Sequence, residues 1–140
     1  GSERDKLSKL AKKLGVSDQV IFCGNKDQDW IYRIIPCVDV IVAPTSGRVL
    51  AEIALGGAPI VAYDTDWHKE IIEQGVTGEL VPDLDYSLMA KSIEKILKDK
   101  DYALKIGSNV RERTLDIMNP KKVNNVLIDT YEELFTLQKL

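Results

Sequence analysis

The segment from Ala43 to Asp64, "APTSGRVLAEIALGGAPIVAYD", limits the possible folds more than any other part of the chain. It contains two apolar runs typical of strands, with a short polar elbow and a nearly all-apolar helix pattern between them. Strands that are apolar on both faces belong in a parallel sheet whose two faces are covered by helices. The segment therefore predicts an α/β fold.

The same alternation of strand and helix patterns continues to about residue 100. The predicted strands occupy residues 19–24, 38–44, 58–64 and 77–83. The predicted helices occupy residues 3–14, 27–38, 46–57, 66–75, 85–100, 101–116 and 120–138. Together they predict one domain over residues 1–140, an open, doubly wound parallel sheet flanked by helices, with extra C-terminal helices. The chain opens with a helix, and four strands are few for such a sheet.

Composition narrows the class of protein. The net charge of −3 argues against a nucleic-acid-binding protein, which usually carries a basic excess. No stretch reaches the roughly 18 consecutive apolar residues of a membrane-spanning helix. The spacing of Cys23 and Cys37 fits no zinc or redox motif, so both are predicted to be buried, free thiols in a reducing compartment. We therefore expect a globular protein of the cytoplasm.

The loop that follows the predicted strand 38–44 is the most informative candidate for a site. In open α/β sheets, ligands bind beyond the carboxyl ends of the strands. Thr45 or Ser46 is a natural N-cap for the next helix, and Gly47 bares the backbone amides of its first turn. Such a helix N-terminus attracts phosphate, and Arg48 would add positive charge there. The same pattern also fits an ordinary capped helix.

Glu52 and His68 each have two interpretations. Glu52 lies on an otherwise apolar helix, so its carboxylate needs a partner. That partner is either Arg48, four residues earlier, or the two hydroxyls of a ribose. His68 is the only histidine and follows the predicted strand 58–64, so it is either a surface residue or one that lines a site and faces a sugar or a phosphate.

An ordered series of motifs resembles one known family. The strings "LAEIALGGAPIVAYD" and "EIIEQGVTGELVPDLD" are similar to the C-terminal half of retaining, family 4-type glycosyltransferases of the GT-B fold, also described as glycosyl transferases group 1. The resemblance covers essentially residues 1–100, because "LAKKLGVSDQVIFCG" also resembles the helix and strand that precede these motifs. The matching positions are Glu52, Ala54, Gly56, Pro59, Val61, Ala62, Glu70, Ile71, Gly75, Thr77, Gly78, Leu80, Val81, Pro82 and Asp85.

The resemblance implies a site for a nucleoside-diphosphate sugar, UDP- or GDP-linked, with no further cofactor and no metal. It implies that Glu52 binds the ribose, that the elbow from Thr45 to Arg48 meets the diphosphate through Ser46, Gly47 and the Arg48 charge, and that the loop with Asn25 and Lys26 meets the nucleobase. His68 is a further candidate for the sugar or the phosphate. No catalytic base is identified.

The chain also departs from the family pattern at two places. The family carries a second glutamate eight positions before the ribose-binding one, and Pro44 stands there in this chain. The family's domain also begins with two strands and a helix before the helix at 3–14, and "GSERDKL" resembles the end of the loop that follows them, which would make Gly1 and Ser2 native. The absent strands belong between 19–24 and 38–43. We therefore expect these two segments not to pair.

The resemblance thus implies the donor-binding half of a glycosyltransferase. It implies an acceptor-binding N-terminal domain in the same protein, to which the helix 120–138 would cross back, and it leaves peripheral membrane association of the full protein open. We expect the 140-residue chain alone to be inactive. Two alternatives remain open: an isomerase similar to the UDP-sugar 2-epimerases, and a nucleotide-binding module without catalysis.

Overall fold

The computed structural model describes residues 2–45 and 47–137 and divides into two compact units, Gly1–Tyr32 and Arg33–Leu140. The first unit contains the helix α1 (Arg4–Lys13), the 3-10 turn η1 (Ser17–Gln19) and most of the helix α2 (Gln28–Ile34). The predicted helix at 3–14 is present, but only Ala11 on its apolar stripe is buried. The carboxylate of Asp27 accepts a hydrogen bond from the Trp30 amide at 2.9 Å and so caps the start of α2.

The predicted strand at 19–24 is wrong for this chain. Residues 20–24 form no helix or strand, and the Ile21 side chain is 84% exposed. A strand is stabilised by hydrogen bonds to a neighbouring strand, and the described residues supply none alongside this segment. The described strand within 38–43, Ile41–Ala43, pairs with Ile60–Ala62.

The second unit is built on a parallel sheet of three described strands, in the order β1 (Ile41–Ala43), β2 (Ile60–Tyr63) and β3 (Glu79–Val81). The register pairs Ile41 with Ile60 and Ala62 with Leu80. All four residues of the central strand β2 are buried, as a strand covered on both faces requires. The fold is therefore an open α/β sheet, as the sequence predicts.

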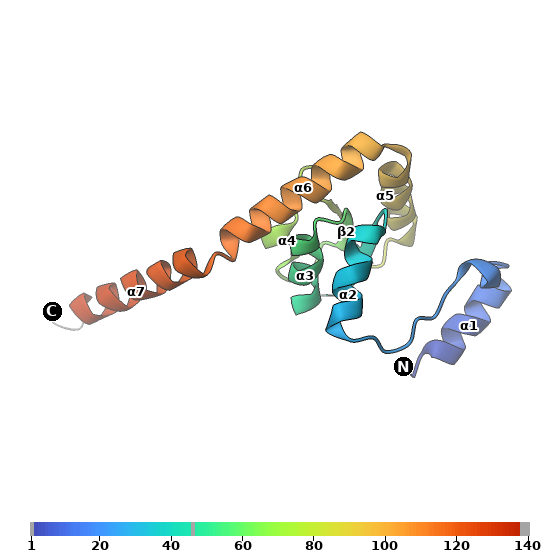
Figure 1. The fold of residues 1–140 in the computed structure, drawn as a ribbon, viewed down its shortest axis with the longest axis horizontal. Coiled ribbons are helices and arrows are strands. Elements are labelled where there is room, and N and C mark those ends of the chain that lie inside the picture. Colours follow the sequence, from blue (N-terminus) through green and yellow to red (C-terminus); the bar gives the residue numbers. More distant parts are fainter. Residues whose placement is uncertain (1, 46, 138–140) are drawn as a thin grey trace. The chain divides into compact units, whose positions relative to one another are not determined.

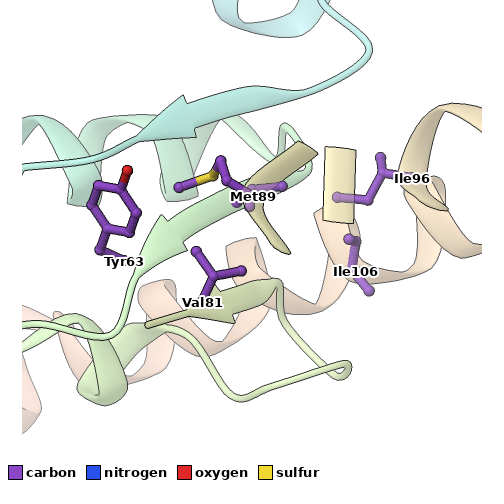
Figure 2. Close-up of a cluster of buried hydrophobic side chains, with 6 residues drawn as sticks. Tyr63, Val81, Met89, Ile96 and Ile106 are labelled. Carbon is purple, nitrogen blue, oxygen red and sulfur yellow. The ribbon is translucent and has the colours of Figure 1, made fainter. Parts of the chain in front are cut away.

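Helices follow each strand. They are α3 (Arg48–Gly56), α4 (His68–Ile71), α5 (Tyr86–Lys98), α6 (Lys100–Ile117) and α7 (Pro120–Leu137), with a 3-10 turn η2 (Ile35–Cys37) before β1. On one face of the sheet, side chains of β2, β3, α5 and α6 form the main buried cluster (Figure 2), whose buried members are Val61, Tyr63, Val81, Met89, Ile96 and Ile106.

The helix α6 packs against α3 and α4 (Figure 1). Two arginine side chains of α6 also donate hydrogen bonds to these helices. Nε of Arg111 donates to the carbonyl oxygen of Leu55 at 3.1 Å, and Nε of Arg113 donates to that of Glu70 at 2.9 Å. These bonds satisfy carbonyl groups at the ends of α3 and α4. A side chain on Gly107 would lie 2.4 Å from the backbone oxygen of Gly57, so the close approach of α6 to α3 depends on glycine.

A buried carboxylate ties β3 to α5 and α6. Oε1 of Glu79 accepts hydrogen bonds from Lys95 Nζ at 2.6 Å and from the Tyr102 hydroxyl, and Oε2 accepts one from Gln74 Nε2 at 2.7 Å. Burial alone would raise the pKa of Glu79, but the bonds from Lys95, Tyr102 and Gln74 outweigh it and hold the pKa below its ordinary value. No sequence pattern predicts this network, which we call the Glu79 cluster.

Two further predictions concern surfaces. The thiols of Cys23 and Cys37 are free as expected, but both are exposed rather than buried. Cys23 is exposed because its segment joins no sheet, and in η2 the buried side chain is Ile35 rather than Cys37. The predicted helix at 120–138 is present as α7, and its described side chains, including Val123, are all exposed.

Among the described helices, none combines the length and the apolar character needed to cross a membrane.

Candidate functional site

The loops after β1, β2 and β3 meet at one edge of the sheet, because the three strands are parallel and adjacent. Each of these loops contains a residue with positive φ: Gly47 (φ 150°), Asp66 (φ 52°) and Leu84 (φ 60°). Within the described residues, Asp66 and Leu84 are the only positive-φ residues other than glycine. Backbone conformations of this kind cost free energy and occur most often at functional sites. The geometry thus agrees with the sequence in pointing to this edge.

The start of α3 differs from the expected cap. Gly47, with φ 150° and ψ 169°, occupies the N-cap position, and no side chain of the described residues caps the helix. Of the two predicted N-caps, Thr45 is wrong because Gly47 occupies that position, and Ser46 lies outside the described residues. The backbone amides of the first turn consequently have no side-chain acceptor in the described part of the chain, which leaves them available to an anion.

Arg48 and Glu52 form the ion pair that their spacing allows. Nε of Arg48 lies 3.5 Å from Oε1 of Glu52, with the Arg48 side chain 89% exposed and the Glu52 side chain 19% exposed. An exposed pair at this spacing typically stabilises a helix by about 0.3–0.5 kcal/mol. The contact is long and engages one carboxylate oxygen, so Glu52 keeps acceptor capacity for a second partner. The two interpretations of Glu52 are therefore compatible with one another.

His68 is a core residue, which corrects the interpretation of a surface histidine. Its side chain is fully buried, and its Nδ1 lies 2.6 Å from the carbonyl oxygen of Tyr63. The centres of the His68 and Trp67 rings lie 6.1 Å apart, and the two rings meet edge-on. Nε2 is buried with no hydrogen-bond partner in the described part of the molecule. Because no part of the ring reaches the surface, His68 does not face a bound sugar or phosphate in this arrangement.

Asn25 and Lys26 belong to the first unit. Both are exposed, they follow Gly24 (φ 71°), and Nζ of Lys26 lies 5.4 Å from the centre of the Trp30 ring. A cation over an aromatic face at this distance is a favourable contact that orders the lysine. Their proposed role at a nucleobase stays a prediction. In the described residues, no group of three or more His, Cys, Asp or Glu side chains is placed to hold a metal ion.

Sequence reasoning missed the two features of the loop after β2, namely the burial of His68 and the positive φ of Asp66. The string "DTDWHKE" is polar and gives no periodic sign that one of its members is buried. The tryptophan before His68 is the one available signal, since a large aromatic residue in a short polar loop indicates local packing. The loop is therefore more rigidly built than its composition suggests.

Comparison with protein families decides the classification. Residues 1–113 match the family described as "Glycosyl transferases group 1". The chain belongs to this family. The resemblance carried by its motifs is thereby confirmed.

Individual relatives of the chain agree with this family assignment. The lipopolysaccharide core biosynthesis glycosyltransferase LpsE of Rhizobium meliloti is 32% identical over 116 residues, which is 80% of this chain and 34% of that protein. The alpha-D-kanosaminyltransferase of Streptomyces kanamyceticus is 29% identical over 113 residues, 78% of this chain and 29% of that protein. The chain thus spans about a third of the length of these relatives.

Solved structures agree as well. The sucrose-phosphate synthase of Thermosynechococcus elongatus superimposes with a TM-score of 0.83 at 28% identity, over 98% of this chain and 35% of that one. HepE of Anabaena, in a complex with UDP, superimposes with a TM-score of 0.82 at 26% identity, over 94% of this chain and 38% of that one. The predicted Rossmann-like α/β fold is therefore confirmed, and the chain spans 35% and 38% of these two structures.

Proposed function

We propose that this chain is the donor-binding part of a glycosyltransferase that transfers a sugar from a nucleoside-diphosphate sugar to an acceptor. Family membership and the glycosyltransferase names of its relatives support transfer over the isomerase alternative. The observation that carries the proposal is the start of α3, where Glu52 keeps a free carboxylate oxygen one turn from a helix N-terminus without a described side-chain cap. A diphosphate and a ribose diol are complementary to these two features.

In this proposal, the residues around α3 divide the donor between them. Glu52 accepts hydrogen bonds from the ribose hydroxyls, and bonds to a charged acceptor are worth about 1.5–3 kcal/mol each. The Gly47 backbone and the Arg48 guanidinium bind the diphosphate, with Thr45 and Ser46 supplying the polar elbow. When the sugar leaves, negative charge develops on the diphosphate, and fixed donors at that point lower the barrier. No residue is assigned as the catalytic base.

In this proposal, other parts of the protein bind the nucleobase and the acceptor. Asn25 and Lys26 stay the candidates for the nucleobase. A further domain of the same protein binds the acceptor, and the exposed apolar stripe of α7, which includes Leu127 and Tyr131, packs against it. The nucleotide sugar is the substrate, so no further cofactor is invoked. The two free thiols are consistent with a cytoplasmic location.

The test is calorimetric titration of the chain with UDP, GDP and UDP-glucose, run in parallel on Glu52→Ala and Glu94→Ala. Glu94 is a matched control because it also forms an i,i+4 pair, with Lys98 on α5. We expect the wild type to bind one of the nucleotides, Glu52→Ala to weaken binding tenfold to a hundredfold, and Glu94→Ala to leave it unchanged. Equal affinity of all three proteins would contradict the assignment of Glu52.

The non-catalytic alternative requires a different measurement. A full-length protein that contains this chain is assayed for hydrolysis and transfer of the sugar from whichever nucleotide sugar the chain prefers. Transfer to an acceptor, or slow hydrolysis to the free sugar, supports the enzyme. Tight nucleotide binding with neither reaction would support a binding module. This outcome is worth testing because Pro44 stands where the family has its other glutamate.

A further inference from the structure

We propose that His68 is a positioning residue of the donor site, which acts by holding the loop between β2 and α4. The inference rests on the proposed donor-binding function and goes beyond it, because nothing in the family motifs assigns this histidine. Its side chain joins the two ends of the loop, since Tyr63 is the last residue of β2 and His68 the first of α4. The bond that joins them runs from Nδ1 of His68 to the Tyr63 carbonyl oxygen at 2.6 Å.

The chemistry of this bond fixes the state of the ring. A carbonyl oxygen only accepts hydrogen bonds, so Nδ1 of His68 carries a proton. The ring is fully buried and the described residues place no acceptor at Nε2, so a second proton there would leave a buried charge without a partner. His68 is therefore the neutral tautomer with the proton on Nδ1 and a bare lone pair on Nε2.

An unpaired buried acceptor of this kind makes packing alone a poor explanation. A buried polar atom without a partner costs the free energy of its lost hydration, and few occur in native proteins. A phenyl ring would fill the same space without that cost. What histidine supplies and phenylalanine cannot is the donor at Nδ1, so the bond to Tyr63 is the property that the position uses.

The loop held by this bond lies where it can shape the donor site. It contains Asp66, whose φ of 52° is unfavourable for a residue with a side chain. β1 and β2 are adjacent, with Ala43 opposite Ala62, so the loop after β2 lies next to the loop that leads into α3. The amide of Asp64 donates to the Val81 carbonyl at 2.7 Å, the ring of His68 binds the Tyr63 carbonyl, and the backbone amide of His68 donates to the Thr65 carbonyl at 3.2 Å. Loss of the bond from the His68 ring releases the loop beside Gly47.

Two substitutions separate positioning from packing. In His68→Asn, the amide nitrogen takes the place of Nδ1 and keeps a donor to Tyr63, while the ring is lost. In His68→Phe, the ring is kept and both nitrogens are lost. We expect His68→Phe, which keeps the ring but leaves the Tyr63 carbonyl without its donor, to melt no lower than His68→Asn and to bind UDP or GDP about tenfold more weakly than the wild type. We expect His68→Asn to melt lower, because it leaves a cavity, and to bind within about twofold of the wild type.

The experiment is thermal melting and calorimetric titration of the chain and the two variants with UDP and GDP. If affinity follows stability, so that His68→Asn binds weakly and His68→Phe binds normally, His68 is a packing residue and the proposal is overturned. Nitrogen-15 spectra of the imidazole must also show the proton on Nδ1, and a proton on Nε2 alone would overturn it independently. If the folded wild type binds neither nucleotide, the donor-binding function itself fails. If the wild type and both variants all bind normally, that function stands and the positioning role of His68 is overturned.

Discussion

Glu52 and Glu79 are two carboxylates shielded from solvent in the same small domain, and their surroundings are opposite. Both oxygens of Glu79 are engaged, by Lys95 and Tyr102 on one side and Gln74 on the other. Glu52 has one long contact, to an arginine that is itself almost fully exposed. A partly buried carboxylate with unused acceptor capacity is poorly explained by stability and well explained by a ligand.

The same contrast extends to the surroundings of the two residues. The Glu79 cluster links β3, α5 and α6, and so holds the layers of the fold together. The carboxyl edge of the sheet, in contrast, contains the start of α3 with no described side-chain cap, the unpaired Nε2 of His68 and two strained backbone positions. In the proposed function, stability and binding thus use separate parts of the second unit.

The largest expected effect is on the free energy of unfolding when Glu79 is removed. Glu79→Ala leaves Tyr102 and Gln74 without their acceptor and creates a cavity, so we expect a loss of about 2–3 kcal/mol. Lys95 is half exposed and can turn to water, which limits the cost. Glu52→Ala is expected to cost less than about 0.5 kcal/mol. Urea unfolding measures both, and equal costs would show that Glu52 is structural.

The second prediction concerns ligand binding by Arg48. If Arg48 interacts with the diphosphate, Arg48→Gln should weaken UDP about tenfold and leave the affinity for uridine, which has no phosphate, unchanged. Glu52→Gln should weaken both ligands, because both have the ribose diol. The control is Lys98→Gln, which removes the cation of the other i,i+4 pair. Chemical-shift titrations cover the weaker ligand, and parallel losses for UDP and uridine in Arg48→Gln would contradict the separation of roles.

A third, smaller effect is the dependence of stability on pH. The pKa of Glu79 is lowered in the folded state, from an ordinary value of 4.5, so the folded state binds a proton less readily than the unfolded chain. The contribution of Glu79 is therefore complete above pH 4.5 and is lost as the pH falls through the lower, folded pKa. The free energy of unfolding should therefore fall more steeply between pH 6 and pH 3 in the wild type than in Glu79→Gln. Parallel pH profiles would show that the carboxylate is not stabilised by its partners.

Local sequence patterns predict some elements of this domain and miss others. The strands around Ile41 and Ile60 and the helix α5 were predicted because β-branched runs and helical periodicity are local signals. The segment 19–24 has the same local pattern, but a strand also requires a neighbour, and local sequence does not contain one. Likewise, the members of the Glu79 cluster become partners only because α5 and α6 pack on the sheet.

The candidate site was predicted to the level of the loop but not of the atom. The string "TSGR" offers Thr45 or Ser46 as the cap, whereas the backbone geometry places Gly47 at the N-cap position. The pairing of Arg48 with Glu52 was foreseen as one of two alternatives, because i,i+4 spacing is fixed by the helix. The burial of His68 could not be foreseen, since it depends on how α4 packs after β2.

The smallest expected effect tests whether the Arg48–Glu52 pair matters to the fold. The contact is 3.5 Å long and its arginine is 89% exposed, so salt screens it and little free energy is needed to break it. Arg48→Ala should therefore change the free energy of unfolding by less than about 0.5 kcal/mol, and 1 M NaCl should not change the difference between variant and wild type measurably. Lys98→Ala, on α5, is expected to behave in the same way. A loss above about 1 kcal/mol for Arg48→Ala alone would mean that Glu52 depends on its arginine, and the free acceptor capacity on which the donor site is argued would then be in doubt.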